Sequence, residues 1–197
     1  MSRRVSLGGA ALICLAALAG GCAAPAPVAV AAAPVQAGTA RAERVAEALV
    51  LAERAERAAD PAALVQAAAR LERLGAKPGT PADEEAMQRW FASLPADTAV
   101  MRGRALGPAY RSAALDPGAT TQLNQTFLGG RSAQIVLRVS RGPTPRLVVR
   151  DQSDREVCKV AADDPLKCRW VPIYTQRHSI EIVNTGPKMS EFYIVFD

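Results

Sequence analysis

The spacing of apolar residues changes near residue 107, and this change restricts the possible folds more than any other feature of the sequence. Upstream, apolar side chains recur three and four residues apart, which is typical of one face of an α-helix. Downstream they alternate with polar residues, which is typical of half-buried β-strands. We therefore expect an α+β protein, with a short helical segment at residues 40–106 followed by an antiparallel β-sandwich at residues 107–197.

The helical segment is expected to contain three helices. Asp60-Pro61 combines a capping side chain with a proline suited to the first turn, and Gly75 suits a helix C-terminus. Thr80 marks the start of a third helix, with Asp83 in the position of a capping-box glutamate. The apolar stripe of the first helix comprises Val45, Leu49, Ala52 and Ala59. That of the third comprises Met87, Trp90, Phe91 and Leu94, which we expect to pack in a core, a ligand-binding patch being the alternative.

Short alternating segments separated by turn sequences fill residues 107–197. The clearest strand positions are Ile135, Leu137 and Val139, then Leu147 and Val149, then Ile180 and Ile182, then Phe192, Ile194 and Phe196. The turns are marked by Gly129-Gly130, Gly142-Pro143, Asp163-Asp164-Pro165 and Gly186-Pro187. Seven or eight strands at this spacing predict a jelly-roll or immunoglobulin-like sandwich, which we expect to fold without the helices.

Residues 1–21 have the features of a secretory signal peptide. Arg3 and Arg4 precede an apolar run of about a dozen residues, shorter than the roughly 20 that a membrane-spanning helix needs. The small residues before Cys22 resemble the lipobox of bacterial lipoproteins. This resemblance implies that Cys22 is acylated, becomes the new N-terminus and anchors the protein in a membrane.

Two features of this region leave alternatives open. Ordinary cleavage after Ala23 or Ala24 would release a free periplasmic protein, and the sequence does not decide between the Sec and twin-arginine export routes.

Residues 22–39 are rich in alanine and proline and carry no charge. We expect them to form an extended tether between the anchor and the folded part.

Two cysteines remain after the signal peptide and Cys22 are set aside. Cys158 and Cys168 have nine residues between them and are expected to form a disulfide in an exported protein. A zinc site is a poor alternative, because the chain has a single histidine and no second cysteine pair. No metal and no cofactor are therefore assigned.

Several segments of the predicted sandwich follow one another in a recognisable order. They are Phe127 to Ala133, Leu147 to Asp151, Cys158, Cys168-Arg169-Trp170-Val171-Pro172, and Ile180 to Gly186. In this order they resemble the β-sandwich of bacterial pre-peptidase C-terminal-like domains. They look more like a group of uncharacterised secreted proteobacterial proteins that place an Ala-rich helical segment before such a domain. The resemblance implies a fold and an extracytoplasmic compartment, and no established activity.

The chain departs from this pattern where relatives often carry acidic residues suited to calcium. The corresponding stretch, 141–146, has no carboxylate. Calcium needs six to eight oxygen ligands, largely from carboxylates and carbonyls. The remaining acidic residues are interpreted as solvated hairpin turns and are Asp151, Asp154, Asp163 and Asp164.

No catalytic residue is assigned. His178 is the only histidine in the sequence, and it has the same parity as Ile180 and Ile182, so we expect it to pack in the sandwich. A catalytic triad would also need a nucleophile and an orienting acid, and the sequence has no Gly-x-Ser-x-Gly turn. The sequence singles out no pair of carboxylates for glycoside hydrolysis. The protein is therefore expected not to be an enzyme.

The charge distribution bears on the partner. Residues 98–197 carry 14 basic and 9 acidic side chains. Outside the cytoplasm such a domain is better suited to anionic envelope polymers or lipid headgroups than to nucleic acid. We expect a non-catalytic binding or structural module, periplasmic or anchored in the outer membrane, that mediates a protein interaction.

The alternative is a sandwich that binds a glycan, another anionic polymer or lipid headgroups. Arginines between residues 131 and 177 would make the contacts, together with the aromatic side chains of Tyr174 and Trp170. Trp170 is more simply interpreted as packing beside the Cys158–Cys168 bridge. The sequence names neither the partner, nor the membrane leaflet, nor the oligomeric state.

Overall fold

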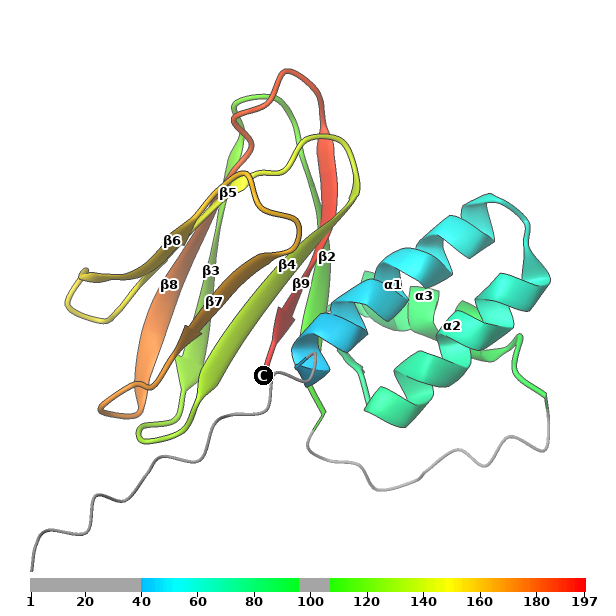
Figure 1. Ribbon diagram of the computed structural model, residues 1–197, viewed down its shortest axis with the longest axis horizontal. Helices are drawn as coiled ribbons and strands as arrows, with labels where there is room; N and C mark the ends of the chain where they lie inside the picture. Colours follow the sequence, from blue (N-terminus) through cyan, green and yellow to red (C-terminus); the bar gives the residue numbers. More distant parts are fainter. Residues whose placement is uncertain (1–39, 96–106) are drawn as a thin grey trace, which may run out of the picture. The chain divides into compact units, whose positions relative to one another are not determined.

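The computed structural model describes residues 40–95 and 107–197 (Figure 1). These residues contain three α-helices and nine β-strands, so the α+β class predicted from the sequence is correct. Ala37–Asp197 forms one compact unit. The predicted signal peptide, Cys22 and the tether lie outside the described residues. None of the helices in the described ranges is long and apolar enough to cross a membrane.

The helices begin and end where local sequence signals place them. They are α1 (Arg41–Arg57), α2 (Pro61–Leu74) and α3 (Pro81–Phe91). The Asp60 carboxylate caps α2 by accepting a hydrogen bond from the Ala63 amide at 3.0 Å. Gly75 ends α2 with a φ of 66°, in the left-handed region that favours glycine. Thr80 caps α3 by accepting a hydrogen bond from the Asp83 amide at 3.2 Å.

One predicted residue of the α1 stripe is wrong. Val45, Leu49 and Ala52 are buried as expected, but Ala59 is exposed and lies beyond the end of α1. Its φ of 52° places it in the turn between α1 and α2. The helix stops at Arg57 because Asp60 and Pro61 start the next helix only three residues later.

Nine strands form two sheets. They are β1 (Lys77–Pro78), β2 (Ala109–Leu115), β3 (Thr120–Phe127), β4 (Ala133–Arg141), β5 (Arg146–Arg150), β6 (Glu156–Val160), β7 (Leu166–Trp170), β8 (Gln176–Val183) and β9 (Ser190–Phe196). Sheet A has the order β1-β2-β9-β4-β7, and sheet B has the order β3-β8-β5-β6. Every pairing is antiparallel except that of the two-residue strand β1 with β2. Strands β2 to β9 are distributed over the sheets in the order of a jelly roll, one of the two sandwich types predicted, with β5 and β6 adjacent in sheet B.

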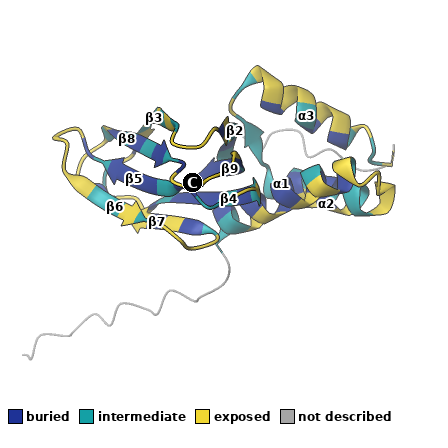
Figure 2. Ribbon diagram, turned by 90° about the horizontal axis from the view of Figure 1, so that it is seen from above, coloured by how far each residue is buried: buried dark blue, intermediate teal, exposed yellow. Residues whose placement is uncertain are grey.

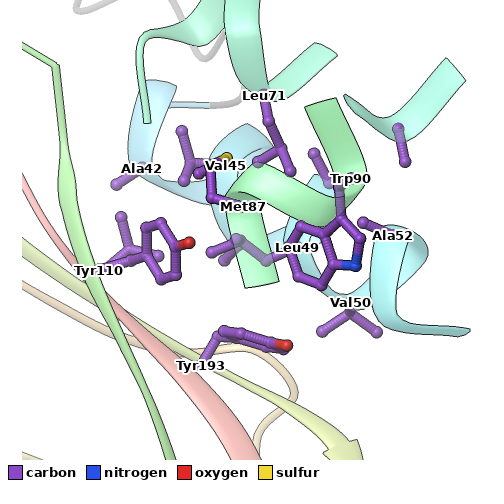
Figure 3. Packing of buried hydrophobic residues seen from close by; sticks show 14 of the residues in the cluster. Ala42, Val45, Leu49, Val50, Ala52, Leu71, Met87, Trp90, Tyr110 and Tyr193 are labelled. Atoms are coloured by element: carbon purple, nitrogen blue, oxygen red, sulfur yellow. The ribbon is translucent and has the colours of Figure 1, made fainter. Parts of the chain in front are cut away.

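The central strands of sheet A, β4 and β9, are largely buried on both faces (Figure 2). The inner face of sheet A meets sheet B in a core that includes Ile135, Leu137, Phe192 and Ile194. Its outer face carries the helices, and Figure 3 shows Trp90, Met87 and Leu49 packed with Tyr110 and Tyr193 of the sheet. The interpretation of the α3 stripe as core packing is therefore correct.

Asp83 joins α3 to the sheet. This carboxylate is 2% exposed and accepts hydrogen bonds from the Ser112 amide at 3.0 Å and the Thr80 hydroxyl at 2.6 Å. The Tyr110 hydroxyl donates to the Asp83 main-chain oxygen at 3.1 Å. Burial raises the pKa of Tyr110, and the Asp83 charge raises it further. The predicted capping residue is thus also the polar contact between the two layers.

Candidate binding surface

Two loops at one end of the sandwich expose large apolar side chains. The β3–β4 loop spans residues 128–132 and the β7–β8 loop spans residues 171–175, and both lie at the lower end of the sandwich in Figure 1. The apolar loop surface that they form consists of Leu128 (52% exposed), Val171 (60%), Ile173 (77%) and Tyr174 (73%). Single exposed apolar residues are normal, but a cluster of this kind marks an interaction site in many soluble proteins.

Hydrogen bonds hold the two loops together. The Gly130 amide donates to the Pro172 carbonyl at 2.7 Å, and the Gly129 amide donates to the Thr175 hydroxyl at 3.0 Å. Glycine is required at position 129, because a Cβ there would lie 2.8 Å from the backbone of Tyr174 and of Thr175. Because the loops brace each other, the apolar loop surface is held in one arrangement.

Three aromatic rings pack together at the strand ends from which the loops emerge. The ring centroids of Phe127 and Trp170 are 4.8 Å apart in an edge-to-face arrangement, and those of Phe127 and His178 are 5.4 Å apart. The indole nitrogen of Trp170 donates to Nε2 of His178 at 3.2 Å, while Nδ1 of His178 lies 3.3 Å from the Gln176 carbonyl. Since Nε2 accepts, Nδ1 carries the proton and donates to that carbonyl. These contacts come from the strand ends on which the loops are built.

The position of His178 agrees with the packing role predicted for it. The side chain is 1% exposed, and both ring nitrogens have partners. A general base needs a free nitrogen within reach of its substrate, and this ring offers none. Trp170 is half-buried against the inner core, and its ring contacts are Phe127 and His178.

Arginines lie on either side of the apolar loop surface. Arg131 follows Leu128 in one loop, while Arg169 and Arg177 flank the other. All three are exposed, and among residues 40–95 and 107–197 none of them forms an ion pair. The Nε of Arg169 donates to the Ser132 hydroxyl at 3.1 Å. The segments 120–134 and 166–180 contain no Asp or Glu. Asp197, whose backbone pairs with Gln134, is an acidic residue at this end, so the three arginines leave an excess of positive charge there.

A disulfide closes the sandwich beside this end. Cys158 on β6 and Cys168 on β7 are bonded, with 5.9 Å between their Cα atoms. β6 is an edge strand of sheet B and β7 an edge strand of sheet A, so the bond joins the two sheets along one open side. The predicted bridge is therefore confirmed. Such a bond is typical of proteins that fold in an oxidising compartment.

Asp151 lies in a turn as predicted, but the expectation that it is solvated is wrong, because the residue is 5% exposed and its carboxylate is held by hydrogen bonds within the turn. It accepts hydrogen bonds from the Ser153 amide at 2.8 Å and from the backbone and side chain of Arg155 at 3.0 and 2.9 Å. Burial alone would raise the pKa of Asp151, but these hydrogen bonds and the Arg155 charge outweigh it and hold the pKa below its usual value. In the described part of the chain, no group of three His, Cys, Asp or Glu side chains is arranged to hold a metal ion.

A second, polar cleft lies on the outer face of sheet A beside α1. It has a volume of about 280 Å³, and its lining includes Glu53, Ser112, Ser140, Glu191 and Tyr193. The two carboxylates belong to ion pairs, Glu53 with Arg57 and Glu191 with both Arg141 at 2.9 Å and Arg57 at 3.6 Å. These pairings neutralise the cleft and give it a structural role between helix and sheet.

No family model matches the sequence, and no curated protein matches it. Parts of solved structures are similar to the sandwich. The pre-peptidase C-terminal domain of a Bacillus anthracis collagenase is 10% identical, with 45% of this chain and 87% of that chain covered and a TM-score of 0.41. The Yersinia pseudotuberculosis-derived mitogen YPM is 14% identical, with 46% and 84% covered and a TM-score of 0.38. Aeromonas hydrophila PliG, a periplasmic inhibitor of g-type lysozyme, is 6% identical, with 50% and 91% covered and a TM-score of 0.38.

A pre-peptidase C-terminal domain is thus among the similar structures, at 10% identity and over 45% of this chain, and the resemblance to that family stays a prediction. Membership of the secreted proteobacterial group and a lipoprotein signal stay predictions.

Sequence reasoning found part of the candidate surface. It named Tyr174, Trp170 and the arginines between 131 and 177 as contacts for an anionic partner. It missed Leu128, Val171 and Ile173, because apolar residues in a turn give no periodic signal. The available signal was their position, since each lies in a turn segment where an exposed side chain is the ordinary outcome.

Proposed function

We propose that this protein is a non-catalytic binding module of the bacterial cell envelope, and that it holds its partner through the apolar loop surface. The observation that carries the proposal is the exposure of Leu128, Val171, Ile173 and Tyr174 on two loops that brace each other. Binding through a surface that is already ordered costs less conformational entropy than ordering a flexible loop. Tyrosine and arginine, represented here by Tyr174 and the flanking arginines, are enriched among the residues that carry most of the binding energy in protein complexes.

The chemistry of the described side chains favours binding over catalysis. The nitrogens of His178 are engaged by Trp170 and Gln176, and the oxygens of Asp151 are engaged by Ser153 and Arg155. Groups that are hydrogen-bonded in this way fix the fold. They do not present a nucleophile and base to a substrate.

The envelope location is supported by one observation and one prediction. The Cys158–Cys168 bond suits an oxidising compartment. The predicted signal peptide and the predicted acylation of Cys22 would supply the export route and the anchor. An acylated Cys22 would keep the folded unit within a tether length of a membrane.

The experiment uses a protein of residues 37–197, because this unit contains all of the described helices and strands and both cores. It would be immobilised and exposed to a detergent-solubilised envelope fraction of the host bacterium. The parent is compared with Ile173→Ser/Tyr174→Ser and with Met189→Ser, which alters an exposed apolar residue at the other end of the sandwich.

We expect the parent and Met189→Ser to retain the same envelope component and the double variant to lose it. Equal retention by all three proteins, with unchanged circular dichroism, would contradict the proposal. Salt separates the two predicted kinds of partner, because contacts made through exposed arginines weaken as ionic strength rises while apolar contacts do not.

A further inference from the structure

The apolar loop surface and its arginines form two layers. Ile173 and Tyr174 lie in the middle of the β7–β8 loop, whereas Arg169 and Arg177 lie on the strands that lead into and out of it. In the other loop Leu128 is followed by Arg131. Exposed apolar side chains therefore occupy the two loops, and arginines lie in the loops or on the strand residues next to them.

From this arrangement we infer that the occupant of the apolar loop surface is the surface of a bilayer that contains anionic phospholipids. The inference rests on the proposed function and names its partner. Apolar side chains enter the region between headgroups and acyl chains, while arginines remain at the level of the phosphates. Tyrosine is enriched at this depth because its ring is apolar and its hydroxyl stays hydrated.

Charge complementarity supports an anionic surface. Arg131, Arg169 and Arg177 are exposed residues and form no ion pair within the described residues. Each basic residue near an anionic leaflet strengthens binding by a factor of roughly five. The guanidinium fork also matches the geometry of a phosphate.

The exposed apolar residues favour a bilayer over an anionic polymer. A polyanionic glycan would contact the arginines and gain little from Ile173 or Leu128, because its surface is hydrated and charged. A bilayer would contact both the apolar side chains of the loops and the arginines. The braces between Gly129, Gly130 and the facing loop then keep the apolar side chains exposed without a cost for ordering them on binding.

The test measures co-flotation of the 37–197 protein with lipid vesicles, at low and high ionic strength. One set of vesicles contains phosphatidylcholine alone, and the other contains equal parts of phosphatidylcholine and phosphatidylglycerol. The loop variants are Ile173→Ser/Tyr174→Ser and Arg131→Gln/Arg177→Gln. Their matched controls are Met189→Ser and Lys188→Gln, which change exposed residues in the loop between β8 and β9 at the other end of the sandwich.

We expect the parent to bind the anionic vesicles and to bind phosphatidylcholine alone at least about tenfold more weakly. The double apolar variant should lose about tenfold or more in partitioning at both salt concentrations. The double arginine variant should lose about twenty-five-fold in partitioning at low salt, a factor of roughly five for each arginine, and much less at high salt. Both control variants should bind like the parent.

The inference is overturned if the parent does not float with either set of vesicles, or if the loop variants float like the controls. It is also overturned if binding depends on the arginines alone, which is the behaviour of a polyanion site. Retention of an envelope protein that needs Ile173 and Tyr174, without any vesicle binding, would overturn the lipid partner and leave the proposed function standing. If neither vesicle binding nor retention of an envelope component depended on Ile173 and Tyr174, both the lipid partner and the proposed function would be overturned.

Discussion

At the scale of single residues, Asp151 shows how a turn is fixed by one buried acid. Its side chain is 3% exposed, yet the carboxylate keeps a depressed pKa because the backbone and guanidinium of Arg155 surround it with donors. The ordinary pKa of this group is 3.8. The folded state therefore binds its proton less readily than the unfolded chain does.

This shift predicts a loss of stability in acid. The contribution of the Asp151 carboxylate is fully present above pH 3.8, the unfolded value, and is lost as the pH falls through the lower folded value. The variant Asp151→Asn should lower the midpoint of thermal unfolding by a few degrees at neutral pH, and the difference from the parent should shrink in strong acid. Thermal scans over this range would check it.

Asp154→Asn is the matched control, because the Asp154 side chain lies in the same turn and is 91% exposed. The midpoint of thermal unfolding of Asp154→Asn should differ little from that of the parent at any pH. A parent and an Asp151→Asn protein that differ equally at all pH values would show that the carboxylate does not titrate in this way.

Single residues also show where prediction from sequence stops. Asp60, Gly75 and Thr80 act as the sequence predicts, because a cap depends only on the few residues beside it. Asp83 was predicted as part of a cap, but its bond to Ser112 joins segments 29 residues apart. A contact of that kind follows from the tertiary fold, so no local pattern contains it.

At the scale of elements, the disulfide determines how the edge strands β6 and β7 are joined. These strands follow each other in the chain and lie in different sheets, so the bond closes a short loop across the open side of the sandwich. In the chain-entropy picture a loop of this length stabilises the folded state by about 2–3 kcal/mol.

Removing this bond should therefore destabilise the protein without unfolding it. The variant Cys158→Ala/Cys168→Ala should unfold roughly 5–10 °C below the parent, given the size of the folded unit. Differential scanning calorimetry would measure the change. The reduced parent is the control and should show a similar shift. An unchanged midpoint in both would mean that packing alone holds β6 and β7 together.

The strands were easier to predict than the layer that covers them. Alternation correctly placed Phe192, Ile194 and Phe196 on the inner face. Tyr193 and Val195 between them are also buried, and they meet the helices. An unbroken apolar run of this length is typical of a strand that is covered on both faces. An alternating pattern of apolar and polar residues assumes that one face of the sheet is exposed to solvent. It could therefore not show that the helices pack on this sheet.

At the scale of the whole molecule, helices and sandwich depend on one another. Four residues of the sandwich belong to the core that the helices complete, namely Tyr110, Val136, Tyr193 and Val195. The sequence analysis expected residues 107–197 to fold alone. The shared core leads us to expect otherwise, because the isolated sandwich would expose this apolar face to water.

The prediction for the isolated 107–197 fragment is a large loss of stability. Exposing four large side chains costs roughly 5 kcal/mol or more, which is comparable to the whole stability of a typical domain. The fragment should aggregate or show no cooperative unfolding, while the 37–197 protein unfolds in one transition. Thermal unfolding followed by circular dichroism would check this, and a cooperative transition near that of 37–197 would show that the sandwich is self-sufficient.

The separation between the loops and the two cores has a consequence for protein engineering. Leu128, Val171, Ile173 and Tyr174 belong to neither core, whereas the strand ends beneath them are fixed by the aromatic rings and the disulfide. Other amino acids could therefore replace these four while Gly129 and Gly130 are kept. The jelly roll would then serve as a display scaffold, on which libraries of loop sequences could be selected for new targets without redesigning the framework.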